Sequence, residues 1–132
     1  MLKRDITYED FNGNQVTETF YFNLTKSEIV ELEADYDGGL QAAISRIVAA
    51  EDTKALIKEF KRIILTAYGQ KSEDGKRFIK SDDLRDEFAQ TAAYDALFME
   101  LATSDSLAAD FMTGIIPRDM ARAIGEIETT ES

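Results

Sequence analysis

Adjacent and nearby carboxylates are the residues in this sequence that come closest to an active-site pattern. Asp82 and Asp83 are neighbours, and Glu87 follows within the same predicted helix. Two carboxyl groups held a fixed distance apart serve as acid and base in glycosidases. These residues, however, follow Ser81 at a predicted helix start, where carboxylates stabilise the positive end of the helix dipole. Capping and a solvated helix surface explain them better than catalysis does, and we predict no catalytic residue.

Metal, cofactor and nucleotide sites have no better support in the sequence. The acidic turns at 35–38 and 73–75 lack the alternating oxygen ligands and final Glu of an EF-hand loop. The chain contains no His and no Cys, which excludes thiolate nucleophiles, Ser-His-Asp triads and Cys/His zinc sites. It also has no glycine-rich phosphate loop. We therefore expect no metal, no cofactor and no enzymatic activity.

A row of basic side chains is the best candidate for a binding surface. It runs from residue 54 to residue 62 at helical spacing, opposite an apolar stripe. A solvated helix surface is the simpler explanation, and docking of an acidic partner or subunit is the alternative. To this row we add the end of a polar loop and two aromatic residues as candidate partner-binding residues. The full set is Lys54, Lys58, Lys61, Arg62, Lys76, Arg77, Phe78, Tyr21 and Phe22.

Composition is typical of one globular domain. The chain has 132 residues, of which 44% are hydrophobic and 31% charged, enough to build a single core without disulfides. Its 26 acidic and 15 basic side chains give a formal net charge of −11, which argues against binding to nucleic acid. The charge is net acidic in residues 1–45 and 81–132 and net basic in 46–80. This segregation favours either neutralisation within one subunit or head-to-tail contact between copies.

Membrane insertion and secretion have no support in the sequence. No apolar run approaches the roughly 20 residues that span a bilayer. The start, Met-Leu-Lys-Arg-Asp, lacks the apolar region of a secretory signal. We therefore expect an intracellular protein with no membrane partner.

The first predicted element is a β-hairpin at about residues 5–22. Residues 5–11 and 15–22 are rich in β-branched and aromatic residues, and the turn dipeptide Asn12-Gly13 lies between them. Alternation places one set of apolar side chains on a common face. This set is Ile6, Tyr8, Val16, Phe20 and Phe22. Because a lone hairpin is only marginally stable, it must pack on the helices that follow or on the hairpin of a neighbouring subunit.

The rest of the chain carries helix signals. Thr25 and Glu28 form a capping box for a helix that ends before residue 37. Apolar spacing predicts a second helix over 40–48. It also predicts a third helix, which Thr53 can cap and which ends at Gly69. Residues 70–80 are predicted to form an ordered loop. Further helices are expected to start after Ser81, near Thr91 and at Ser104, and a last one to span 118–127.

These elements predict a mainly α fold, in which the N-terminal hairpin precedes a compact bundle of about five to seven short helices. We expect a single α-rich domain over residues 1–125. Residues 126–132 are expected to form an acidic flexible tail.

Several stretches of the sequence carry a resemblance to a known family. They are Phe-Tyr-Phe-Asn-Leu-Thr-Lys at 20–26, Tyr-Gly-Gln-Lys-Ser at 68–72, Asp-Gly-Lys-Arg-Phe-Ile-Lys at 74–80, Gln-Thr at 90–91 with Ala-Tyr at 93–94, Leu-Phe-Met-Glu-Leu-Ala at 97–102, and Gly-Ile-Ile-Pro at 114–117. Together they resemble the tail assembly chaperones of long-tailed, siphovirus-type bacteriophages of Gram-positive hosts. None of these stretches is a catalytic signature.

The resemblance implies an assembly role in the host cytoplasm. Such a chaperone binds the phage tape measure protein in multiple copies and keeps it soluble until tail tube protein polymerises around it. It then leaves, so it is not expected in the mature virion. The resemblance also implies recruitment of tail tube protein by a frameshift-extended form. The segregated charge adds the expectation of self-association. Two alternatives remain open, namely a structural minor tail or connector subunit of the virion, and an acidic inhibitor that mimics nucleic acid.

Overall fold

The computed structural model describes residues 1–34, 38, 42 and 53–120. Its strands are β1 (Leu2–Glu9), β2 (Gln15–Phe22), β3 (Tyr68–Lys71) and β4 (Phe78–Ile79). Its helices are α1 (Lys26–Glu33), α3 (Thr53–Ala67), α4 (Asp82–Ala89), α5 (Ala92–Ala102) and α6 (Asp105–Ile115). The strands form one antiparallel sheet in the order β1-β2-β3-β4. The described part of the chain is therefore a sheet combined with helices.

The predicted N-terminal hairpin forms and is slightly longer than expected. Its strands pair without interruption from Leu2↔Phe22 to Glu9↔Gln15. The Asp10 carboxylate closes the turn by accepting hydrogen bonds from the backbone N–H groups of Asn12 and Asn14, both at 2.9 Å. Gly13 has a φ of +83°, a conformation that glycine adopts without steric cost. The Asn-Gly turn signal was therefore sufficient to locate this hairpin.

A second hairpin makes the prediction of a mainly α, or all-α, bundle wrong. Tyr68 and Gly69, which we expected to end a helix, form β3 and pair with Phe22 and Tyr21 of β2. The expected loop at 70–80 contains half of β3 and all of β4. The apolar stripe at helical spacing includes Tyr68, but the helix ends one residue earlier, at Ala67. Pairing with β2 outweighs the local helical pattern, as tertiary contacts often do.

Gly69 serves close packing and does not cap a helix. A Cβ atom at this position would lie 2.7 Å from Cε2 of Phe78 and 2.9 Å from the carbonyl oxygen of Ile79. Its backbone is not in the left-handed conformation. Among the described glycines, those with a positive φ are Gly13, Gly38 and Gly75. A glycine in a strand often marks such a close approach.

The helix starts agree with the capping signals. Thr25 and Glu28 form the capping box of α1, and Ser81, Thr91 and Ser104 are the N-caps of α4, α5 and α6. Helix α3 includes Thr53, which we expected to cap it, as its first residue. The helix predicted over 40–48 falls outside the described residues except at Ala42, and that over 118–127 is described only to Met120. The tail at 126–132 lies outside the described part, and the 1–125 domain stays a prediction.

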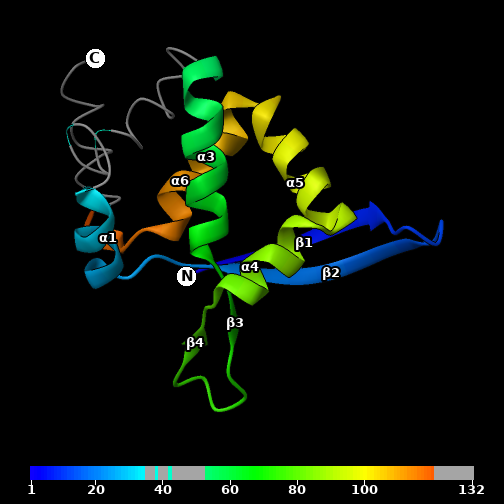
Figure 1. Ribbon diagram of the computed structural model, residues 1–132, viewed down its shortest axis with the longest axis horizontal. Coiled ribbons are helices and arrows are strands. Elements are labelled where there is room, and N and C mark those ends of the chain that lie inside the picture. Colours follow the sequence, from blue (N-terminus) through cyan, green and yellow to red (C-terminus); the bar gives the residue numbers. More distant parts are fainter. Residues whose placement is uncertain (35–37, 39–41, 43–52, 121–132) are drawn as a thin grey trace.

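Helices cover one face of the first hairpin (Figure 1). Helices α3, α5 and α6 lie on one side of β1 and β2, and the β3–β4 hairpin extends away from the other side. Backbone hydrogen bonds join distant segments at the end of β2: Asn23 N–H donates to Ala67 C=O at 2.8 Å, and Leu24 N–H donates to Ile115 C=O at 2.7 Å. The core therefore lies between the end of β2 and the helices.

Aromatic rings make up much of this core. The rings of Tyr68 and Phe88 stack with centroids 4.2 Å apart. Phe22 is fully buried, with its centroid 5.1 Å from that of Phe111 and 5.8 Å from that of Phe88. Rings at these separations contribute more than their buried area alone. The core thus joins β2, β3, α4 and α6.

Replacing Gly69 by Ala is expected to lower the free energy of unfolding by about 1–3 kcal/mol, because the added methyl group would overpack the contact with Phe78 and the β4 backbone. Urea unfolding at neutral pH measures the change. Gln70→Ala is the matched control, since Gln70 is an exposed residue of the same strand. Equal stability of the two variants would contradict the close-packing role of Gly69.

Candidate partner-binding surface

Helix α3 presents a basic surface opposite its buried side. Phe60, Ile63, Ile64 and Ala67 are buried in the core, whereas Lys58, Lys61 and Arg62 are exposed. Lys54 lies in the first turn of the same helix. The basic row predicted from the sequence therefore lies on one helix, and its described members face solvent.

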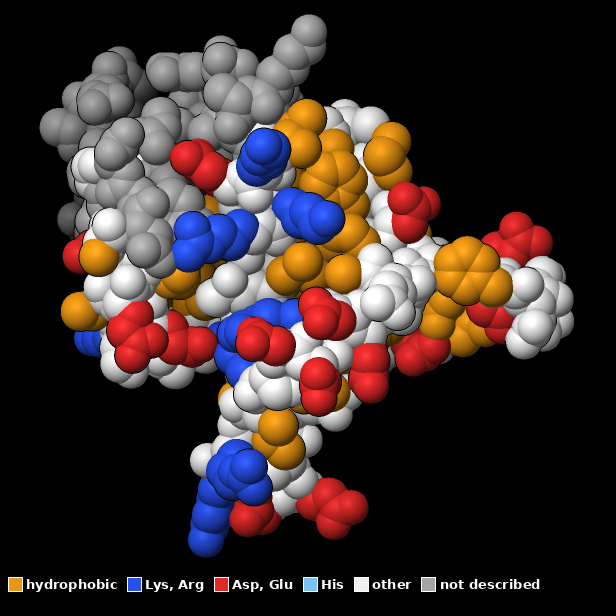
Figure 2. Space-filling model, in the orientation of Figure 1, with side chains coloured by type: hydrophobic (Ala, Val, Ile, Leu, Met, Phe, Trp, Pro, Cys, Tyr) orange, Lys and Arg blue, Asp and Glu red, His pale blue; other side chains and the backbone are white. Residues whose placement is uncertain are grey.

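An apolar strip lies between α3 and α5 (Figure 2). The Phe60 and Phe98 ring centroids are 6.1 Å apart across the two helices, and Tyr94 and Phe98 are 6.0 Å apart along α5. Phe98 and Tyr94 are only partly buried, and Ile57 is 43% exposed. Figure 2 shows basic side chains beside this strip.

We call these features together the α3–α5 surface. It consists of Ile57, Lys58, Lys61 and Arg62 on α3 and Tyr94 and Phe98 on α5. Partial burial, and secondly the charge of Asp95, raise the pKa of Tyr94. The shift favours the neutral hydroxyl, which can donate a hydrogen bond. An apolar strip with a basic margin is suited to an amphipathic partner that carries acidic residues.

The basic residues of the second hairpin lie far from α3. Lys76 and Arg77 are exposed at the turn between β3 and β4, which points away from the helices (Figure 1). Sequence reasoning placed both basic groups in one candidate set, but the fold separates them. Phe78, the third residue of this group, is partly buried against Gly69.

Internal hydrogen bonds order the β3–β4 turn. The Ser72 hydroxyl donates to the Asp74 carboxylate at 2.7 Å, and the backbone N–H of Lys76 donates to the same oxygen at 3.0 Å. These two hydrogen bonds lower the pKa of Asp74, and the bond from the Lys76 backbone has the larger effect. Gly75 completes the turn with a φ of +72°. The turn therefore presents Lys76 and Arg77 from an ordered backbone.

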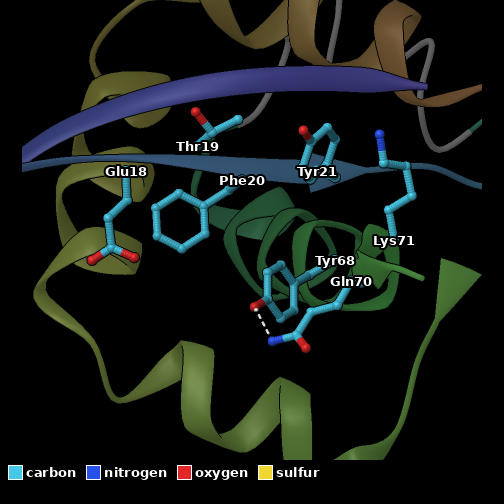
Figure 3. A pocket seen from close by; sticks show the side chains of 8 residues that line it. Glu18, Thr19, Phe20, Tyr21, Tyr68, Gln70 and Lys71 are labelled. Carbon is cyan, nitrogen blue, oxygen red and sulfur yellow. Dashed lines mark hydrogen bonds between the residues drawn. The ribbon is translucent and has the colours of Figure 1, made fainter. Parts of the chain in front are cut away.

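Tyr21 and Phe22 point to opposite faces of β2, as successive strand residues must. Phe22 is fully buried. Tyr21 helps to line a groove of about 270 Å³ between β2 and β3 (Figure 3), where Lys71 Nζ lies 5.3 Å from its ring centroid. In the same groove the Gln70 side chain donates a 3.4 Å hydrogen bond to the Tyr68 hydroxyl. Only Tyr21 of this pair is therefore positioned for contact with a partner.

A half-buried ion pair, which sequence analysis did not identify, fixes the base of the second hairpin. Lys80 Nζ donates to Glu28 Oε2 and to the carbonyl oxygen of Asn23, both at 2.6 Å. Burial lowers the pKa of Lys80, and its bond to Glu28 offsets this only in part. Burial alone would raise the pKa of Glu28, but hydrogen bonds from Lys80 and Thr25 outweigh it, so that this pKa lies below its ordinary value. The pair joins residues distant in sequence, which spacing could not reveal.

The Lys80–Glu28 pair predicts a loss of stability in acid. A carboxyl group whose pKa is lower in the folded than in the unfolded chain stabilises the fold above its unfolded value, here 4.5, and loses this contribution as the pH falls through the folded pKa. Glu28→Gln should therefore be less stable than wild type at neutral pH, and the difference should shrink in acid. Urea unfolding of both chains from neutral pH to about pH 3 measures this. A difference that is constant with pH would contradict the assignment.

Metal sites and membrane spans were sought in the described part of the structure. Within residues 1–34 and 53–120 no group of three His, Cys, Asp or Glu side chains is placed to hold a metal ion. None of the described helices is long and apolar enough to cross a membrane.

Comparison with known proteins identifies a family. No curated protein and no solved structure matches the chain. A family model described as "Phage tail assembly chaperone" matches residues 1–131.

Proposed function

Because this chain belongs to the phage tail assembly chaperone family, we propose that it binds the tape measure protein in multiple copies and keeps it soluble until tail tube protein polymerises around it. The coarser role, assembly of phage tails, follows from the family. The tape measure protein as partner, a siphovirus-type phage and a Gram-positive host are the parts that we add.

The α3–α5 surface is the observation that supports this function. Ile57 and the partly buried Phe98 offer apolar contact, while Lys58 and Lys61 offer charge beside it. A long helical partner with an apolar stripe and acidic flanks would bind here in the helix-in-groove manner. Aromatic residues and flanking charges are typical of such interfaces.

Charge supports binding that is multiple and reversible. The net charge of −11 makes copies repel one another at a distance, which keeps them soluble. Contact between the basic α3 of one copy and acidic segments of the next would oppose this repulsion locally. Many weak contacts along one long partner then sum to stable coating, and each copy remains replaceable by tail tube protein.

We further propose where the protein acts and how tail tube protein reaches it. The protein would act in the host cytoplasm and leave before the virion matures. A frameshift-extended form would bring the tail tube protein. Mass spectrometry of purified phage particles tests the first point, since a chaperone should be missing from particles that contain tape measure protein, and its presence at stoichiometric level would favour a structural tail subunit.

Co-expression with the tape measure gene of the same genome tests the central proposal. Light scattering of the purified complex should give a mass that corresponds to several copies of this chain per tape measure chain. Tape measure protein expressed alone is the control and should be insoluble. A soluble tape measure protein without bound chaperone, or the absence of any complex, would overturn the proposal.

A further inference from the structure

Strand β1 has an open edge. It lies at the end of the sheet and, within the described residues, pairs only with β2. Asp10 N–H donates to Asn14 C=O at 2.8 Å just beyond the strands, and hydrogen-bonded pairs alternate along an antiparallel ladder. The N–H and C=O groups of even-numbered β1 residues therefore point to β2. Those of Lys3, Asp5, Thr7 and Glu9 point outward from the sheet.

Strand β1 carries the charged side chains Lys3, Asp5 and Glu9, which oppose pairing with most strands, but it lacks other usual protections of an edge. Such edges are commonly blocked by proline, by bulges or by short length. Strand β1 has eight residues, no proline and an uninterrupted register. The one charged side chain of β1 on its helix-covered face, Arg4, is already paired with Glu100 of α5 at 2.8 Å. The open edge is therefore competent to pair with another strand.

We propose that β1 pairs with β1 of a second copy, antiparallel and about a two-fold axis at Ile6, so that two sheets become one. The facing pairs of this register are Lys3 with Glu9, Arg4 with Tyr8, Asp5 with Thr7, and Ile6 with Ile6. The outward-directed backbone groups of Lys3, Asp5, Thr7 and Glu9 would meet as hydrogen-bonded pairs. The occupant of the edge is thus a second copy of this chain.

Charge selects both the partner and the register. With the axis at Ile6, Lys3 of each copy faces Glu9 of the other, and all four side chains are exposed on the outer face of the sheet. With the axis at Asp5, the Asp5 side chains of the two copies would face each other. With the axis at Thr7, Asp5 of each copy would face Glu9 of the other. Facing opposite charges stabilise a strand pair, and facing like charges destabilise it. The Ile6 register is therefore favoured over its two neighbours.

This pairing uses a surface separate from α3 and does not depend on the proposed function. It is isologous, so that it closes as a dimer, whereas basic-to-acidic contact through α3 runs head to tail. A chain that binds no tail protein would still form this dimer. Reversing the charge of Lys58 and Lys61 should leave the dimer intact, which separates failure of either proposal from failure of the other.

Charge exchange at β1 tests the pairing in the full-length chain. At protein concentrations low enough to dissociate the weak head-to-tail contacts, sedimentation equilibrium should show a wild-type dimer. Lys3→Glu or Glu9→Lys alone should weaken this dimer by about tenfold, since each makes two facing pairs repulsive. The double variant Lys3→Glu/Glu9→Lys should dimerise like wild type. An equimolar mixture of the two single variants should form a heterodimer, because every facing pair is then complementary. A monomeric wild-type chain, or single variants that dimerise like wild type, would overturn the proposal.

A proline variant tests the backbone contact. Thr7→Pro removes an N–H that points to the open edge and leaves the β1–β2 hydrogen bonds in place, as proline at an edge allows. The variant should keep its far-ultraviolet circular dichroism and be monomeric. Thr17→Pro, in the facing position of β2, is the matched control, because Thr17 does not lie on the β1 edge. A folded Thr7→Pro chain that still dimerises, or a Thr17→Pro chain that folds but is monomeric, would overturn pairing through this edge.

Discussion

Replacement of Phe22 by Ala is expected to lower the free energy of unfolding by about 3–5 kcal/mol, the range for a large aromatic residue removed from a core. Phe22 is fully buried, and its ring centroid lies 5.1 Å from that of Phe111, 5.8 Å from Phe88 and 5.9 Å from Tyr68. These rings come from different elements, so no single side chain can fill the space. A domain with a typical stability of about 5–15 kcal/mol would lose a large part of it.

Tyr21→Ala is the matched control for this prediction. Tyr21 is the neighbouring aromatic residue on the opposite face of β2, and its contact with Lys71 is a cation–π interaction worth about 0.5–1 kcal/mol at an exposed site. Thermal and urea unfolding of both variants measure the difference. Equal destabilisation would contradict the placement of Phe22 in the core. If Tyr21→Ala stays folded, its affinity for the partner then reports on the predicted binding role of Tyr21 alone.

Reversing the charge of Lys58, Lys61 and Arg62 to Glu is expected to weaken binding of the tape measure protein by about 100-fold. An exposed ion pair contributes up to about 1 kcal/mol, and each reversal replaces attraction by repulsion. The same variant should abolish head-to-tail self-association. Binding is measured by titration at low and at physiological salt, because screening reduces the effect of exposed charges, and self-association is measured by light scattering.

The second basic group provides a comparison of the same kind. Lys76→Glu with Arg77→Glu changes two charges on the β3–β4 turn, and Lys58→Glu with Lys61→Glu changes two on α3. If the α3–α5 surface is the interface, the α3 pair should weaken binding more, because only it adjoins exposed apolar side chains. Equal losses of affinity in the two variants would indicate that net charge governs binding. An unchanged oligomer size in the α3 variant would exclude a role of Lys58 and Lys61 in self-association.

The parts of the fold that the sequence predicted correctly depend on local signals. Asn12-Gly13 determines the first turn, and Thr25, Ser81 and Ser104 start helices by bonds to residues three positions later. The second hairpin could not be predicted in this way. Its strands are short, and Tyr68 continues a helical stripe. Only contact with the distant Tyr21 and Phe22 makes it a strand.

In the candidate site, too, local sequence patterns predicted some residues, whereas others come together only in the fold. The basic row on α3 followed from helical spacing, and its exposed members are where that spacing puts them. Tyr21 and Phe22 were both proposed as binding residues, although strand alternation already placed Phe22 on the apolar face with Ile6. The apolar strip between α3 and α5 and the Lys80–Glu28 pair arise where separate elements meet, which no short-range pattern records.

The hydrogen bond from Leu24 to Ile115 and the ring contact of Phe22 with Phe111 bear on how the chain folds during synthesis. The hairpin leaves the ribosome first, but its apolar face has no α6 to cover it until nearly the whole described chain has followed. Contacts between residues far apart in sequence form late and slowly. During translation the nascent hairpin therefore presents Phe22 and an open strand edge together, and this is the interval in which the chain is most exposed to aggregation.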